Sequence, residues 1–246
     1  MGARANGMAN ASSCLYDVWA LTGNVAGLAK VDRPSIACSY HAIPSAKFFN
    51  RLAAVFALPL KTGVAAASAF RFGDDLYQEQ SLSLGYANTF GLASLGLKVN
   101  YLQYRAAGVG THAVFTASFG GIARLTPRLS FGAHIVNINQ PIIHALTGER
   151  IPTRLITGVA FQPSEKLIAT GEIEKEPGHP PTWKSAVEYQ VFEKITFRTG
   201  YNLHPEAAFF GLGFTFRKFD LGYALQWNDP FGLSHQATVT FEFGNP

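Results

Sequence analysis

Apolar and polar residues alternate in short segments along most of this chain, from about Pro34 to the C-terminus. The clearest example is residues 219–228, FDLGYALQWN, in which large apolar or aromatic residues alternate with small or polar ones. Successive side chains of a β-strand point to opposite faces, so such a segment has one apolar face and one small, polar face. The pattern therefore predicts an all-β chain in which every strand presents an apolar face.

Fourteen segments of this kind are joined by brief connections. They are expected at 35–42, 48–59, 63–72, 77–87, 90–104, 111–123, 128–138, 153–162, 166–175, 182–192, 194–203, 207–217, 219–228 and 233–243. An even number of antiparallel strands with an apolar outer face is typical of a transmembrane β-barrel. A soluble β-sandwich also alternates, but it exposes a charged face, whereas Gly, Ala, Ser and Thr dominate the second face here. We predict a 14-stranded antiparallel transmembrane β-barrel over residues 34–246.

The predicted connections fall into two classes that alternate along the chain. Even-numbered connections such as 88–89 and 163–165 are tight, whereas odd-numbered ones are longer, the largest being 139–152. Outer-membrane barrels have short periplasmic turns and longer extracellular loops. We therefore expect a bacterial outer-membrane protein with periplasmic N- and C-termini. The first residues lack the apolar core of a signal peptide, so we interpret the sequence as the mature chain.

Composition narrows the functional classes. Charged residues make up 15% of the chain and hydrophobic ones 48%, yet no apolar run approaches the about 20 residues of a membrane-spanning helix. The net charge of +4 is dispersed, so we expect no nucleic-acid partner. The seven histidines have no ligand spacing, and no nucleophile motif or P-loop is present. We therefore expect no metal, no cofactor and no enzymatic activity.

Residues 1–33 do not alternate. They are rich in Gly, Ala and Asn and are interrupted by single large residues such as Met8, Trp19 and Leu21. A flexible tail is one interpretation, but the scattered large apolar residues favour burial. We predict that residues 1–33 form a hatch, or plug, inside the lumen of the barrel.

This N-terminal segment carries a recognisable pattern, GARANGMANAS followed by DVWALTGNVAGLAKV. It resembles the hatch of the FadL family of outer-membrane barrels. The matching hatch residues include Gly2, Arg4, Gly7, Met8, Asp17, Asn24 and Gly27. Val25 departs from the pattern, because the family usually has Pro there. The C-terminal third is similar to the PorV/PorQ-like branch of the family, through GEIEK at 171–175, AVEYQVFEKITFRTGYN at 186–202 and GLSHQATVTFEF at 232–243.

The resemblance implies a choice between two functions. Members of the PorV/PorQ-like branch attach to larger outer-membrane machines, including the type IX secretion apparatus. A non-enzymatic accessory subunit of a protein secretion or assembly complex is therefore our first expectation. The alternative is a FadL-type passive transporter of hydrophobic small molecules, although the chain is shorter than such transporters. A water-filled porin fits a plugged lumen least well. The expected partners are outer-membrane lipid, a larger protein complex and possible lipid-like small molecules.

Two further sets of residues are candidates for contacts outside the barrel. Ile142, Ile143 and Leu146 lie at the centre of the largest loop, where they could meet a ligand or a partner. Phe241 and Phe243 lie near the C-terminus, and Phe243 resembles the terminal aromatic signal that outer-membrane assembly machinery reads.

Charged residues are expected on the inner face of the barrel. By strand parity they are Arg51, Arg71, Lys98, Arg154, Glu172, Glu174, Lys184, Glu188, Arg198, Asp220 and Glu242. An ion-selective pore would use such charges to select what passes. In a plugged lumen, however, opposite charges are expected to pair, because a buried charge is costly unless it is paired. Arg4 of the hatch is predicted to reach Glu172, Glu174 or Glu188.

The two cysteines, Cys14 and Cys38, could form a disulfide in an oxidising compartment. Cys38 shares the apolar face of its strand with Ile36 and Tyr40, however, and should point towards lipid. We therefore favour two free thiols.

Overall fold

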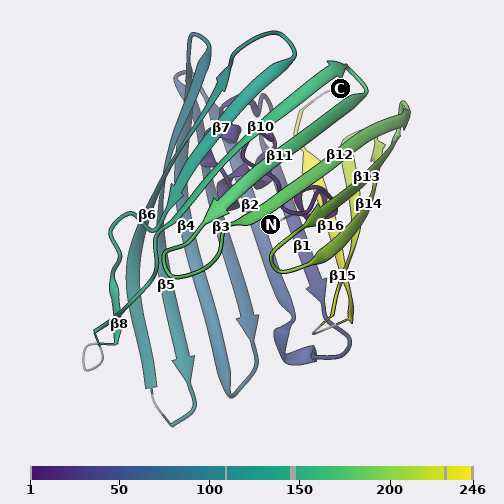
Figure 1. Cartoon of the computed structure of the whole chain (residues 1–246). Coiled ribbons are helices and arrows are strands. Elements are labelled where there is room, and N and C mark those ends of the chain that lie inside the picture. Colours follow the sequence, from purple (N-terminus) through teal and green to yellow (C-terminus); the bar gives the residue numbers. More distant parts are fainter. Residues whose placement is uncertain (1, 109, 145–147, 230–231, 245–246) are drawn as a thin grey trace.

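The structure, a computed structural model, describes residues 2–108, 110–144, 148–229 and 232–244. In this part of the chain, fourteen antiparallel strands close into a barrel, in which β1 pairs with both β2 and β16 (Figure 1). The strands of the barrel are β1 (Ser35–Ala42), β2 (Arg51–Leu60), β3 (Gly63–Gly73), β4 (Tyr77–Phe90), β5 (Ala93–Ala106), β6 (Gly110–Arg124), β7 (Leu129–Val136), β10 (Arg154–Ser164), β11 (Leu167–Lys175), β12 (Thr182–Phe192), β13 (Ile195–Asn202), β14 (Ala207–Phe216), β15 (Phe219–Asn228) and β16 (Gly232–Glu242). The predicted 14-stranded antiparallel barrel is confirmed, with strand bounds that differ by a few residues.

The largest loop contains structure that the sequence pattern did not predict. β8 (Ile142–His144) and β9 (Glu149–Arg150) pair as a separate two-stranded sheet between β7 and β10. Strands of two or three residues are too short for alternation to show. Ile142 and Ile143 lie on β8, and Ile142 is exposed, whereas Leu146 lies outside the described residues.

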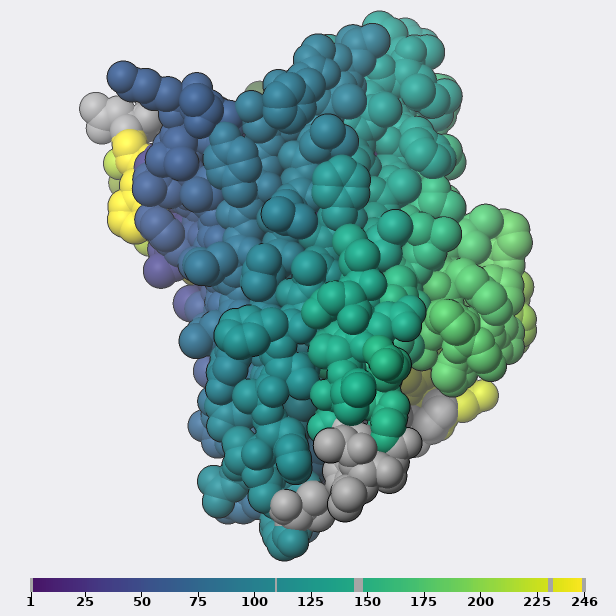
Figure 2. Space-filling view, turned by 90° about the vertical axis from the view of Figure 1, so that its left-hand side faces the viewer, coloured from purple at the N-terminus to yellow at the C-terminus, as the bar shows by residue number. Residues whose placement is uncertain are grey.

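The strands present apolar side chains outward and small ones inward. On β4, Leu82 and Leu84 are 60% and 69% exposed, whereas Ser83 between them is 8% exposed. Lipid solvates such an apolar outer surface, and closure of the barrel leaves no unpaired strand edge. β4, β5 and β6 are the longest strands, so the wall is taller on their side than around β12 to β15 (Figures 1 and 2). No helix among the described residues is long and apolar enough to cross a membrane.

The two ends of the barrel differ in their connections. One end, which we call the turn end, carries short connections such as 61–62, 91–92 and 193–194, together with the C-terminus. The opposite end, which we call the loop end, carries the longer connections 43–50 and 137–153. The first of these contains a short 3₁₀-helix, η3 (Lys47–Phe49).

Residues 2–33, which we call the luminal segment, lie inside the barrel (purple in Figure 1). The segment contains three short helices: α1 (Ala3–Gly7), η1 (Val18–Thr22) and η2 (Val25–Lys30). α1 packs against β13 to β16, and η2 packs against β3 to β6 on the opposite wall. Its large apolar side chains, including Met8, Leu21 and Leu28, are fully buried. The segment therefore crosses the lumen from one wall to the other.

The small residues of the inner wall make room for the luminal segment. A Cβ atom on Gly96 of β5 would lie 2.8 Å from the backbone of Val25 and Ala26. A Cβ atom on Gly120 of β6 would collide with the side-chain oxygen of Asn24. These glycines are required by the close approach of the segment rather than by backbone conformation.

Both cysteines are free thiols, and they lie on opposite sides of the barrel wall. Cys14 is buried in the lumen, where its Sγ lies 3.5 Å from the carbonyl oxygen of Gly158. Cys38 is exposed on the outer face of β1.

Adjacent glycines on β6 allow a test of this packing. Gly120 faces the luminal segment, whereas a Cβ atom on Gly121 would lie 3.3 Å from the flexible end of Leu95. Gly120→Val should lower the free energy of unfolding by about 2 kcal/mol, because it overpacks the contact with Asn24. Gly121→Val should change it by less than about 0.5 kcal/mol. Urea unfolding in lipid vesicles measures both, and equal effects would contradict the inward placement of the segment.

Candidate functional site

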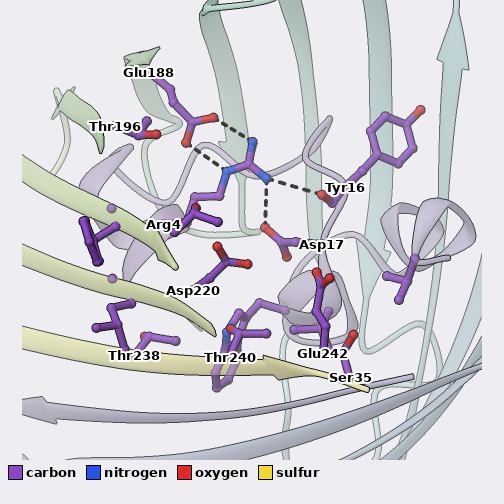
Figure 3. A pocket seen from close by; sticks show the side chains of 18 of the residues that line it. Arg4, Tyr16, Asp17, Ser35, Glu188, Thr196, Asp220, Thr238, Thr240 and Glu242 are labelled. Atoms are coloured by element: carbon purple, nitrogen blue, oxygen red, sulfur yellow. Dashed lines mark hydrogen bonds and ion pairs between the residues drawn. The ribbon is translucent and has the colours of Figure 1, made fainter. Parts of the chain in front are cut away.

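Ion pairs tie the luminal segment to the barrel wall. The Arg4 guanidinium donates two hydrogen bonds to Glu188 on β12, Nη2 to Oε1 at 2.7 Å and Nε to Oε2 at 2.9 Å. Its Nη1 also lies 3.2 Å from Asp17, and Arg198 on β13 donates to Glu188 at 2.5 Å. Figure 3 shows Arg4 between Glu188 and Asp17. Burial alone lowers the pKa of Arg4, but Glu188 and Asp17 together raise the pKa above its ordinary value. Arg4 thus stays charged and holds α1 to the wall.

A second cluster joins the middle of the luminal segment to β10, β11 and β12. Glu172 accepts hydrogen bonds from the backbone N–H of Ser13, at 2.9 Å, and from its hydroxyl group. Lys184 lies between two carboxylates, 2.9 Å from Glu172 and 2.7 Å from Glu174. Arg154 donates to Glu174 at 2.8 Å. A backbone donor and alternating charges therefore satisfy these buried carboxylates.

The remaining inner charges do not join either cluster. Lys98, Arg51 and Asp220 face the lumen but form no ion pair among the described residues. Glu242 has only a half-exposed contact with Arg33 at 3.7 Å. The prediction that the luminal charges pair with one another therefore fails for Lys98, Arg51 and Asp220.

Arg71 was assigned to the inner face, and this assignment is wrong. Arg71 lies opposite Leu52 of β2 and Gln80 of β4, and Leu52 is 54% exposed on the outer wall. The error arises because β3 carries small residues outward, such as Ala67, and Phe70 inward. Hydrophobicity therefore does not distinguish its faces. Arg71 lies near the loop end, where a long basic side chain can reach the aqueous interface.

The residues of the hatch motif share close contacts within the luminal segment or with the wall. Asn24 donates to the carbonyl oxygens of Ser13, at 2.7 Å, and Gly121, at 3.0 Å. Its Oδ1 accepts a hydrogen bond from the Ala26 N–H at 3.2 Å and so caps the N-terminus of η2. The helix begins at Val25, where the FadL pattern usually has Pro. The other motif residues lie as follows: Gly2 against Trp19, Gly7 against Gly211, Gly27 against the carbonyl of Leu15, Met8 fully buried, and Arg4 and Asp17 paired.

Phe241 and Phe243 lie together at the turn end. Their ring centroids are 4.9 Å apart, and the Phe241 ring lies 5.0 Å from that of Phe219. Phe243 is exposed on the outside. Their role as an assembly signal stays a prediction.

The luminal segment separates two main cavities. The loop-end cavity has a volume of about 370 Å³, and the segment contributes Asn6, Asn10 and Thr22 to its lining. The turn-end cavity, shown in Figure 3, has a volume of about 350 Å³ and is lined by Arg4, Asp17 and others. No described residue lines both cavities. The lumen is therefore divided into two compartments.

A third pocket lies on the outside of the wall, across β2 to β5. It has a volume of about 330 Å³ and is lined by apolar residues such as Leu52 and Leu82. Ala69, Phe70 and Ser81 line both this outer pocket and the loop-end cavity. Phe70 and Ser81 are directly paired across β3 and β4. At this pair of strands the wall therefore has a cavity on its inner face and a pocket on its outer face.

No protein-family model matches the sequence, and no curated protein matches it either. Solved structures share its fold. The toluene transporter TbuX of Ralstonia pickettii matches with a TM-score of 0.78 at 10% sequence identity, covering 99% of this chain and 98% of that chain. The toluene transporter TodX of Pseudomonas putida matches with a TM-score of 0.74 at 11% identity, covering 98% and 96%. CymD, a monoaromatic hydrocarbon channel, matches with a TM-score of 0.75 at 10% identity, covering 99% and 98%.

At these identities the likeness establishes the fold alone. The chain has the fold of these transporters and channels, which supports the FadL-like barrel implied by the N-terminal motif. None of the three is named as an enzyme. None is named as a secretion component either, so the narrower PorV/PorQ-like assignment stays a prediction.

The Arg4 ion pair can be tested against an exposed one. Arg4→Met should lower the free energy of unfolding by about 2 kcal/mol, because Glu188 loses a buried bidentate partner but keeps Arg198. Arg33→Met removes the half-exposed contact with Glu242 and should cost less than about 1 kcal/mol. The double variant Arg4→Met/Glu188→Gln should cost more than Arg4→Met alone, because buried Arg198 then also loses its carboxylate partner. Urea unfolding measures all three, and equal costs for Arg4→Met and Arg33→Met would refute the anchoring role.

Proposed function

We propose that this protein is a passive channel for small hydrophobic molecules in the bacterial outer membrane. The observation that carries the proposal is the fold, which is shared with two toluene transporters and a monoaromatic hydrocarbon channel over nearly the full length of each chain. This was the alternative function expected from the sequence. Monoaromatic hydrocarbons are therefore the first class of molecule to test.

The geometry supports a sideways route. A molecule that enters the loop-end cavity meets the luminal segment, whose ion pairs and backbone contacts block the way to the turn end. The wall at Phe70 and Ser81 lies between this cavity and an apolar outer pocket. Apolar molecules gain free energy by leaving water for lipid, so exit through the wall needs no energy input. This route requires the loop end to lie outside the cell and the turn end, with the C-terminus, to face the periplasm, whereas Gly2 and Ala3 at the start of the described chain are buried in the lumen.

The other functions expected from the sequence have less support. A water-filled porin would need a continuous aqueous path, whereas the cavities on the two sides of the luminal segment share no described residue. An accessory subunit would dock through its outer wall, where an apolar groove of about 650 Å³ lies between Phe131 and Trp183. Nothing in the structural neighbours favours a secretion role, so this function stays a prediction.

Uptake of labelled toluene by bacteria that lack hydrocarbon channels tests the proposal. Cells that express this protein should take up toluene faster than cells with an empty vector. Ser81→Trp should reduce uptake to near the vector level, because the indole would fill the loop-end cavity where it meets the proposed exit through the wall. Leu84→Trp is the matched control, because Leu84 lies on the same strand but faces lipid and is 69% exposed.

Leu84→Trp should leave uptake unchanged. If cells that express the unmodified protein take up no more toluene than cells with the empty vector, the protein is not a channel for monoaromatic hydrocarbons. If Ser81→Trp carries as much as Leu84→Trp, the route between β3 and β4 is wrong. Heat-modified mobility on gels measures the amount of folded barrel for each variant, so that uptake is compared at equal amounts of folded protein.

A further inference from the structure

Lys98 is a buried cation that has no partner among the residues that the structure describes. It lies in the middle of β5, faces the lumen and is 8% exposed. It makes no hydrogen bond or ion pair with any described residue, in contrast to Lys184, which contacts two carboxylates. The residues directly opposite Lys98 are Gly85 on β4 and Ser118 on β6. A buried ammonium group without a counter-ion is unfavourable, so Lys98 is poised to bind an anion.

The cavity that Lys98 lines is positively charged. Its charged lining residues are Arg51, Lys98 and Arg154, and no carboxylate lines it in the described part of the chain. Arg154 is paired with Glu174, whereas the Arg51 guanidinium lies over the Phe72 ring, 5.5 Å from its centroid. Two cations of this cavity therefore lack a carboxylate partner.

The opposite side of the luminal segment has the reverse charge balance. Five carboxylates and three cations line the turn-end cavity. They are Asp17, Asp32, Glu188, Asp220 and Glu242, with Arg4, Lys30 and Arg198. An anion is therefore favoured in the loop-end cavity and disfavoured beyond the luminal segment.

A further polar group and an apolar surface complete the loop-end cavity. His41 is buried, and its Nδ1 has no hydrogen-bond partner in the described part of the chain, although its Nε2 lies 3.2 Å from Ser234. Phe70, Leu102 and Val136 contribute an apolar surface to the same lining. The other lining residues are mostly polar, so the cavity offers an apolar patch within a polar, cationic surface.

We propose that the loop-end cavity binds a small organic carboxylate, with the carboxylate group at Lys98 and the apolar body against Phe70 and Leu102. Lys98 would donate a charge-assisted hydrogen bond, which is stronger than a neutral one. A neutral hydrocarbon gains at most a weak cation–π contact from Lys98, and an inorganic anion gains nothing from the apolar surface. The proposal names a ligand class for the channel described above and rests on that function for its route of entry.

Binding of 4-fluorobenzoate and 4-fluorobenzyl alcohol tests the proposal. The two probes have the same ring and differ in charge. ¹⁹F NMR titration of the full chain in nanodiscs measures the binding of each probe, with protein-free nanodiscs as the blank. The unmodified protein should bind 4-fluorobenzoate more tightly than the alcohol. Lys98→Met should weaken binding of the carboxylate about tenfold and weaken binding of the alcohol less, because the hydroxyl oxygen accepts a hydrogen bond from Lys98 but carries no charge. Lys98→Arg should retain the preference.

Arg71→Met is the matched control, because it removes a cation from the outer face of the same wall and should not change carboxylate binding. The proposal is overturned if the unmodified protein binds both probes equally, or if Lys98→Met binds the carboxylate as the unmodified protein does. It is also overturned if sulfate displaces 4-fluorobenzoate at equal concentration, because the cavity would then select charge alone.

Toluene uptake by the same variants separates this proposal from the channel function. Loss of carboxylate binding in Lys98→Met with normal toluene uptake supports the site. Lys98-dependent carboxylate binding by a protein that carries no toluene also supports the site and refutes only the hydrocarbon channel. Normal toluene uptake without Lys98-dependent binding refutes the site and leaves the channel intact.

Discussion

The attachment of the luminal segment to buried charges on the barrel wall determines the rest of the structure. Glu188 and Glu172 are costly to bury alone, and Arg4 and the Ser13 backbone, both from the luminal segment, satisfy them together with Arg198 and Lys184. The same contacts hold the segment across the lumen. Without the segment the barrel would enclose an unfilled polar channel, and Glu188 and Glu172 would keep only the wall cations Arg198 and Lys184 as partners, so the wall and the segment depend on each other.

This division of the lumen produces two compartments with different chemistry. Carboxylates outnumber cations in the lining of the turn-end cavity, whereas the charged residues that line the loop-end cavity in the described part of the chain are all cations. Because the segment blocks the direct path, the proposed exit from the loop-end cavity to lipid passes through the wall at Phe70 and Ser81, which has an apolar pocket on its outer face. An apolar molecule can use such a route, whereas hydrated ions cannot enter the lipid.

The sequence predicted the barrel well because alternation of apolar and polar residues directly reflects the two faces of a strand. It failed for Arg71, because the outward residues of β3 are as small as those of an inner wall. It also missed β8 and β9, which are too short for a period to appear. Pairing within the lumen depends on how the strands are staggered around the barrel. The sequence could therefore suggest Glu188 as a partner of Arg4. It could not show that Ser13 is a partner of Glu172, or that Lys98 has no ion-pair partner among the described residues. The stretch of wall with a pocket on each face has no sequence signal, because such pockets form only where neighbouring strands meet.

Ion conductance of the unmodified protein in a planar lipid bilayer tests the central claim most directly. A luminal segment held across the lumen by buried ion pairs should leave no steady ion current above that of the bare bilayer. Deletion of residues 2–33 from the folded barrel should produce a steady current. A steady open-channel current through the unmodified protein would contradict the account, because the segment would then not close the lumen.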